Sequence, residues 1–206
     1  MRFYVIDNSS RFKDDIYAFG EQVEQKTGDF EVCIKCELPV GMRKWLSPRM
    51  VKLSKLSFGD FVFGTFTTFL CSESFKVAYE KSDLIGITDF QDVQILKVNN
   101  SSKSIVLPQK YYHVTIKRGG TRIDEHKSNL IREVEEELCD ICRVGTIKSF
   151  DSIHIDIPTW NGDDILYPTG LPGTILTSEK FYDFIKKYKF TNINLIPAKE
   201  YKSKWY

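Results

Sequence analysis

The chain has 206 residues, 42% hydrophobic and 28% charged, which is typical of a globular protein that can bury a core without disulfides. Its 29 Lys and Arg residues nearly balance 28 Asp and Glu residues, so the net charge of +1 excludes the extended basic field of many nucleic-acid binders. The sequence contains no apolar run typical of a signal peptide or a bilayer span, and we expect a cytoplasmic protein without membrane partners.

The first expected element is a strand over residues 2–6, where aromatic and β-branched side chains predominate. A CxxC pair follows, and then a β-rich stretch over 58–70. Ser72 and Glu73 predict the start of a helix, because a serine oxygen can accept a free first-turn N–H and a glutamate suits the positive end of the helix dipole. We expect a second strand after this helix.

The polar segment 97–107, which contains NNSSKS, is the predicted linker between two halves, 1–100 and 107–206. The two halves are expected to form one compact unit. The second half begins with a predicted strand over 111–117, which would end in a turn at Gly119 and Gly120.

Residues 128–138 predict a helix, with apolar side chains on one side and glutamates mostly on the other. A second CxxC pair and a β-rich stretch over 165–176 come next. Ser178 and Glu179 then repeat the helix-start pattern, and the helix they open has an apolar stripe predicted to be buried: Phe181, Phe184, Ile185 and Tyr188.

A shift of the sequence by 106 residues places both CxxC pairs on each other and indicates an internal duplication. The same shift aligns eight identities between 64 and 87: Gly64, Thr68, Leu70, Ser72, Glu73, Phe75, Lys81 and Ile87 fall on Gly170, Thr174, Leu176, Ser178, Glu179, Phe181, Lys187 and Ile193. We therefore expect an α+β fold with two related halves joined around a shared interface.

Five cysteines in a chain without an export signal indicate a reducing compartment, where thiols act as metal ligands, in catalysis or as buried side chains. Each CxxC turn can occupy two corners of a tetrahedron, and duplicated halves would bring the two turns together. We predict one structural zinc ion per chain, bound by Cys33, Cys36, Cys139 and Cys142. Two separate redox pairs or unligated buried cysteines are the alternatives. Cys71 is expected to be an ordinary thiol.

No catalytic pattern is evident. The histidines, His113, His126 and His154, form no HExxH or other ligand-spaced pair, and the sequence has no GxSxG, P-loop or GxGxxG. The string from Asn161 to Asp164 is interpreted as a turn, because its spacing lacks the rest of a calcium loop. A four-cysteine zinc site is also coordinatively full, and so we expect that the protein is not an enzyme.

The densest patch of one charge lies just before and within the second CxxC and contains Glu133, Glu135, Glu136, Glu137 and Asp140. It is either a solvated helix face or a docking surface for a basic partner. Nucleic-acid binding through the lysines at 186, 187 and 189 is less favoured, because lysines at a helix end also complement its dipole.

Motifs along nearly the whole chain resemble those of the double-CXXCG motif family of bacterial proteins, whose members include immunity proteins against toxins exchanged between cells. The matching stretches are MRFY at 1–4, CIKC at 33–36, SFGDF at 57–61, CDIC at 139–142, GLPGTILTSEKF at 170–181 and TNINLIPAKEY at 191–201. The glycine that the motif has after each second cysteine is replaced by Glu37 and Arg143. A glycine at this position would permit a left-handed backbone conformation, which a residue with a side chain adopts only with strain.

The resemblance implies an immunity protein that binds and neutralises a cognate protein toxin in the cytosol, without catalysis. The alternative is a zinc-ribbon-like nucleic-acid-binding or regulatory module, which a basic groove near the cysteines would favour. An enzyme would require a deep pocket with a perturbed acid or base. The sequence indicates neither the toxin nor the oligomeric state.

Overall fold

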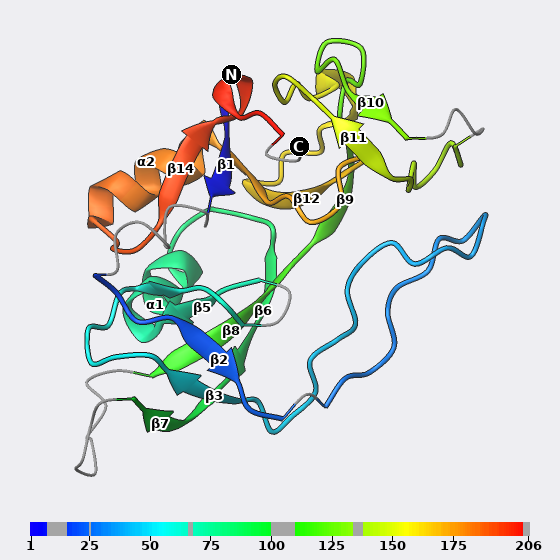
Figure 1. Cartoon of the computed structure of the whole chain (residues 1–206). Helices are drawn as coiled ribbons and strands as arrows, with labels where there is room; N and C mark the ends of the chain where they lie inside the picture. Colours follow the sequence, from blue (N-terminus) through cyan, green and yellow to red (C-terminus); the bar gives the residue numbers. More distant parts are fainter. Residues whose placement is uncertain (8–15, 25, 66–67, 100–109, 134–137, 204–206) are drawn as a thin grey trace.

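The computed structural model describes residues 1–7, 16–24, 26–65, 68–99, 110–133 and 138–203 (Figure 1). Among them, the largest sheet has five strands in the order β14-β1-β13-β12-β9. Their bounds are Asn194–Pro197 for β14, Phe3–Asp7 for β1, Leu176–Ser178 for β13, Ile165–Thr169 for β12 and Arg118–Arg122 for β9. The predicted N-terminal strand is therefore confirmed, and it lies inside a sheet whose other strands come from beyond residue 117.

A second sheet has the order β4-β5-β8-β6, with β4 at Phe61–Val62, β5 at Leu70–Ser72, β8 at Tyr111–Ile116 and β6 at Ile87–Asp92. A third contains β2 (Gly20–Gln22), β3 (Met50–Leu53) and β7 (Gln94–Val98), and a two-stranded sheet contains β10 (Ile131–Arg132) and β11 (Ile147–Ser149). The predicted linker thus begins inside β7, and its residues 100–107 lie outside the described part of the chain. The fold is mixed α+β, as the sequence predicts.

The two α-helices start where the Ser-Glu pairs predict. Helix α1 spans Glu73–Glu80 and helix α2 spans Glu179–Tyr188, and the N-cap oxygens of Ser72 and Ser178 each accept a hydrogen bond from the backbone N–H three residues later. Both caps are buried, and each serine hydroxyl also donates to an aspartate, Asp60 or Asp164, at 2.8 and 2.6 Å. These bonds tie each helix start to the strand that follows the aspartate.

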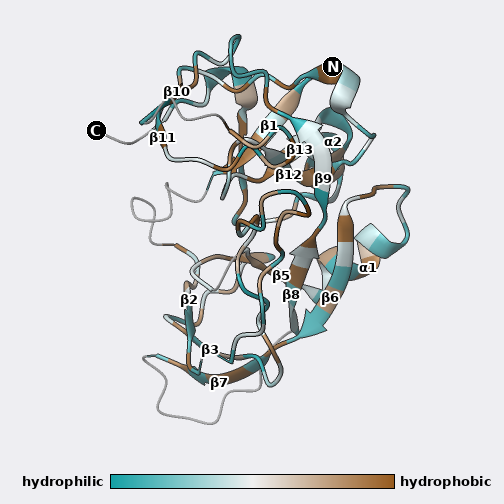
Figure 2. Ribbon diagram, turned by 90° about the vertical axis from the view of Figure 1, so that its right-hand side faces the viewer, coloured by the Kyte–Doolittle hydropathy of each residue, from teal (hydrophilic) through white to brown (hydrophobic). Residues whose placement is uncertain are grey.

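Helix α2 buries most of the predicted stripe. Phe181, Phe184 and Ile185 are buried against a core cluster that includes Phe75 of α1, whereas Tyr188 remains 47% exposed. Figure 2 shows the sheets stacked along the long axis of the molecule, with both helices on the same side. No helix among the described residues is long and apolar enough to cross a bilayer.

Two strands from different parts of the chain occupy matching places in the two larger sheets. Strand β8 pairs antiparallel with β5 and β6, and β1 pairs antiparallel with β13 and β14. The strand register also corresponds. The N-cap serine at the end of β5 or β13 pairs with the first residue of β8 or β1: Ser72 with Tyr111, and Ser178 with Phe3. Each of these sheets is therefore completed by a strand that is distant in sequence.

The structure corrects the prediction of a turn at Gly119 and Gly120. Both glycines lie in β9, which directly follows β8 and pairs in parallel with β12. The chain changes sheets here, because the Lys117 N–H donates to Gly86 O and the Tyr167 N–H donates to Lys117 O. Small residues at a strand junction can mark such a crossing as well as a turn.

The predicted helix over 128–138 is also wrong in its described part. Residues 125–129 form a turn, Ile131 and Arg132 form β10, and residues 134–137 lie outside the described chain. Asn129 adopts a left-handed backbone with φ of 47°, which stops a helix, and the buried Ser128 exchanges hydrogen bonds with His154. Tertiary hydrogen bonds thus override a favourable helical pattern.

Candidate metal centre

The first CxxC lies at the tip of a long irregular hairpin, residues 26–46, here called the first arm. Bridges between Thr27 and Trp45 and between Val32 and Pro39 hold its two sides together. Near the tip, the Cys33 N–H donates to Leu38 O and the Val40 N–H to Glu31 O, both at 2.9 Å. The first arm extends away from the sheets, in blue and cyan at the right of Figure 1.

The second CxxC lies between β10 and β11, and the described residues 130–133 and 138–149 are here called the second arm. The Glu133 N–H donates to Thr146 O at the base of this arm. Arg132 fastens the second arm to the body, donating to Gly145 O at 3.3 Å and to Gly170 O at 3.1 Å. Each CxxC therefore lies on a hairpin-like projection, and the projections approach each other.

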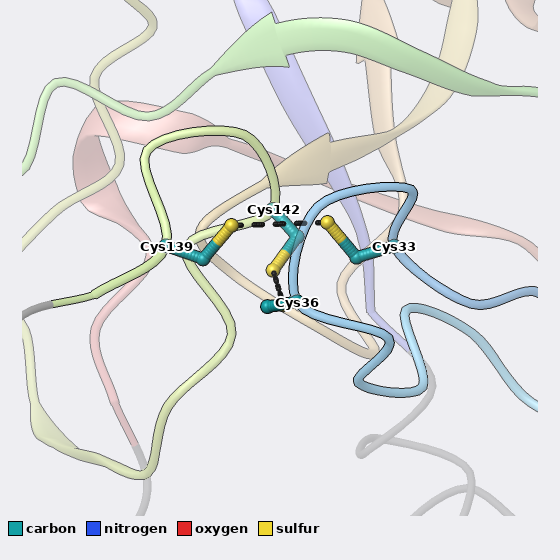
Figure 3. A group of neighbouring side chains, drawn as sticks. All are labelled: Cys33, Cys36, Cys139 and Cys142. Atoms are coloured by element: carbon teal, nitrogen blue, oxygen red, sulfur yellow. Dashed lines mark hydrogen bonds between the residues drawn. The ribbon is translucent and has the colours of Figure 1, made fainter.

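The four cysteines Cys33, Cys36, Cys139 and Cys142 meet between the arms (Figure 3). Their Sγ atoms all lie within 4.8 Å of one another, and the shortest separations that cross between arms are 3.7 Å from Cys33 to Cys139 and 3.5 Å from Cys36 to Cys142. All are free thiols. No other group of three or more potential ligands was found within the described residues.

The spacing of the sulfurs fits a tetrahedral metal. Four thiolates at about 2.3 Å from a zinc ion would lie roughly 3.8 Å apart, whereas a disulfide requires about 2.05 Å. The separations of 3.5 and 3.7 Å are close to the first value. The cluster can therefore hold a metal ion that prefers four soft ligands.

Both turns direct backbone N–H groups at their first sulfur. The N–H groups of Cys36 and Lys35 hydrogen bond to Cys33 and lower its pKa to about 6, and those of Cys142 and Ile141 lower the pKa of Cys139 in the same way. Burial instead raises the pKa of Cys142 to about 12. Four adjacent thiols cannot all ionise without a compensating cation, which a bound metal would supply.

Glu37 and Arg143 adopt the left-handed backbone that glycine would otherwise provide, with φ of 58° and 49°. Their N–H groups each donate to the carbonyl of the first cysteine of the motif, at 2.9 Å. The two turns therefore have the same geometry despite the missing glycines.

An ion-pair network supports the second turn. Glu125 Oε1 accepts hydrogen bonds from Arg132 at 2.7 Å and from Arg143 at 2.8 Å. Burial alone would raise the pKa of Glu125, but the two arginines outweigh it and hold the pKa below its ordinary value. Sequence reasoning missed Glu125 and Arg132, because neither lies in a recognisable motif.

The two arms are also joined by an exposed ion pair between Lys35 and Asp140 at 2.7 Å. Asp140 therefore faces the first arm. Glu133 is exposed beside β10, and Glu135, Glu136 and Glu137 lie outside the described residues. The expected acidic docking surface accordingly remains a prediction.

The other chemically notable residues lie apart from the cysteines. Cys71 is buried in β5, and burial raises its pKa well above the ordinary value, as for an unreactive core thiol. His113 is buried in β8, near Thr68 and Gln91. His126 and His154 join no group of metal-ligating side chains within the described chain.

The chain was compared with protein-family models and with curated proteins, and neither comparison gave a match.

Proposed function

We propose that this chain is an immunity protein: a zinc-stabilised, non-catalytic binder that neutralises a cognate bacterial protein toxin in the cytosol. One zinc ion per chain, bound by Cys33, Cys36, Cys139 and Cys142, would join the two arms. The donor set and the sulfur separations of 3.5 and 3.7 Å support this ion. Four thiolates leave no open position for an activated water, and so the metal's role is structural.

The two halves are proposed to be related by duplication, with their first strands exchanged. Three kinds of correspondence support this interpretation: the 106-residue shift that aligns the CxxC pairs, the matching strand orders of the two sheets, and the matching Ser-Asp pairs at the helix starts. Such a duplication explains how cysteines so distant in sequence come to face each other.

Apolar side chains exposed around the cysteines carry the proposal of a protein partner. Ile34, between the two cysteines of the first turn, is 91% exposed, and Ile141, between those of the second turn, is 42% exposed. Val32 and Leu38 beside them are also exposed. Apolar groups gathered on one surface are typical of protein interaction sites, and a rigid metal centre beneath them would lower the entropy cost of binding.

The acidic residues Glu133, Glu135, Glu136 and Glu137 are proposed as a second part of the contact. Many intracellular toxins act on nucleic acids or nucleotides and have basic clefts, which an acidic surface would attract. Glu133→Lys combined with Glu136→Lys should slow association with the toxin and reduce its salt dependence. Unchanged kinetics would remove these glutamates from the interface without affecting the rest of the proposal.

The decisive experiment uses the candidate toxin encoded beside this chain's gene. Co-expression should protect cells, and purified proteins should form a stoichiometric complex by calorimetry. Ile34→Asp should weaken the complex at least about tenfold, as expected for a central interface residue. Val77→Asp, which changes an exposed residue of α1, is the matched control.

Three outcomes would contradict the proposal. Protection without a detectable complex would favour an enzymatic or regulatory role. Specific DNA or RNA binding by the zinc-loaded protein would favour the zinc-ribbon-like module. If Ile34→Asp and Val77→Asp changed the affinity for the toxin equally, the surface beside the cysteines would not be part of the toxin interface.

A further inference from the structure

A cavity of about 490 Å³ lies between the first arm and the β6 and β8 strands of the second sheet, on the face that carries His113. Residues 39–46 of the first arm line one side, and residues 113–116 of β8 line the other. Val144 of the second arm and the segment around Gly173 complete the lining. This volume lies in the range of small-molecule binding sites, about 300 to 1,000 Å³.

The cavity has an apolar lining. Met42 and Leu46 of the first arm, Val144 of the second arm and Tyr167 line it. Val114 and Ile116 border it through their backbone, because their side chains belong to the core on the other face of the sheet. Trp45, only 2% exposed, packs edge-on against His113 with ring centroids 5.3 Å apart. These side chains provide the packing surface that an aromatic or aliphatic ligand requires.

The polar lining is mainly cationic. Arg43, Lys44, Arg49 and Arg118 line the cavity, against two carboxylates, Glu31 and Asp89. Asp89 already accepts a hydrogen bond from the Gln91 side chain at 2.9 Å. The lining therefore favours an anionic ligand.

Two of these arginines lack the partners that buried charges normally have. Within the described chain, neither Arg49 nor Arg118 has a carboxylate within ion-pair distance, although Asp89 and Asp92 attract Arg49, and Glu31 attracts Arg118, from farther away. Burial outweighs this attraction and lowers the pKa of both guanidinium groups. The buried Arg49 Nε and the Trp45 indole N–H also have no hydrogen-bond partner there. A desolvated cation or donor is costly unless it is paired.

We propose that this cavity binds a small organic anion with an apolar body, such as an aromatic or fatty carboxylate, whose charged group pairs with Arg118. The apolar body lies along Met42 and Val144 and against Trp45. A charge-assisted hydrogen bond to the ligand then offsets the free-energy cost of desolvating the Arg118 guanidinium. This site adjoins the cysteine centre at Val144, but none of the four cysteines lines it, and it does not depend on the identity of any toxin.

The test is an NMR titration of the metal-loaded, full-length protein. Its probes are 2-naphthoate, decanoate and, as a neutral match, 2-naphthamide. At least one of the two acids should bind saturably and shift the signals of the Trp45 indole, Met42 and Val144. The amide should bind at least about tenfold more weakly than naphthoate, or not at all, because it lacks the charge-assisted bond.

Arg118→Gln should weaken binding of the acid at least about tenfold, as expected for a lost charge-assisted bond. Arg122→Gln, on the same strand but exposed and outside the cavity, should retain wild-type affinity. The proposal is overturned if neither acid binds at millimolar concentration, if the amide binds as well as naphthoate, or if the signals that shift lie elsewhere. The comparison of naphthoate with naphthamide uses wild-type protein. It therefore tests the proposal even if Arg118→Gln does not fold.

Discussion

Glu37 and Arg143 hold equivalent positions in the two CxxC turns and share a left-handed backbone, but among the described residues only Arg143 has an ion-pair partner. Within that part of the chain, an ion pair therefore compensates the backbone strain on the second arm but not on the first. Substituting each residue by glycine therefore distinguishes the energetic effect of the left-handed backbone from that of the ion pair.

Glycine should have opposite effects at these two positions. Glu37→Gly should leave stability unchanged or raise it by up to about 1 kcal/mol, because glycine removes the left-handed penalty at some cost in unfolded-state entropy. Arg143→Gly should lower stability by roughly 1–3 kcal/mol, because Glu125 loses a charged partner in a partly buried place. Denaturant unfolding of the zinc-loaded variants measures both. A similar change in both variants would contradict this account.

Cys36→Ala should remove the metal and lower the melting temperature by more than about 5 °C, because metal-binding energy is also folding energy. Elemental analysis of reduced, untagged protein should give one zinc per wild-type chain. Cys71→Ala is the control, because it removes a buried thiol outside the cluster and should keep the zinc. Less than about half an equivalent in the wild type would contradict a structural zinc site.

Ser178→Ala should destabilise the fold by about 1–2 kcal/mol, because it removes both the N-cap of α2 and the hydroxyl bond to Asp164. Ser57→Ala, at an exposed position, should be nearly neutral. Chemical denaturation compares the two. A cost for Ser178→Ala no larger than that of the control would mean that the buried Ser-Asp pair contributes nothing net.

Loss of the metal should also weaken the proposed anion site. Residues 39–46 form one wall of the cavity and belong to the arm whose tip the cysteines hold. Cys139→Ser, made on the other arm, should lower naphthoate affinity severalfold because the wall is no longer fixed. The same titration measures it. Unchanged affinity in a variant that has lost its zinc would show that the first arm is held by its own contacts.

The sequence predicted the features that depend on local chemistry. Ser72 and Ser178 start helices because the cap bond forms within one turn. Each CxxC turn likewise forms through its own backbone bonds, whereas the meeting of the two pairs was predicted from the 106-residue shift and not from local chemistry. The helix predicted over 128–138 failed, because Ser128 bonds to the distant His154. The crossing at Gly119, the Glu125 network and the arginine-lined cavity likewise depend on contacts between distant segments, which no local pattern encodes.

The place of β1 has a consequence for how the chain folds during synthesis. This strand leaves the ribosome long before its partners β13 and β14, near residues 176–178 and 194–197. Its edges stay unpaired until those residues have been translated. The other sheet needs only β8, near residue 111, and can be complete much earlier. An unpaired apolar strand that waits this long is the segment of a nascent chain that a chaperone would shield.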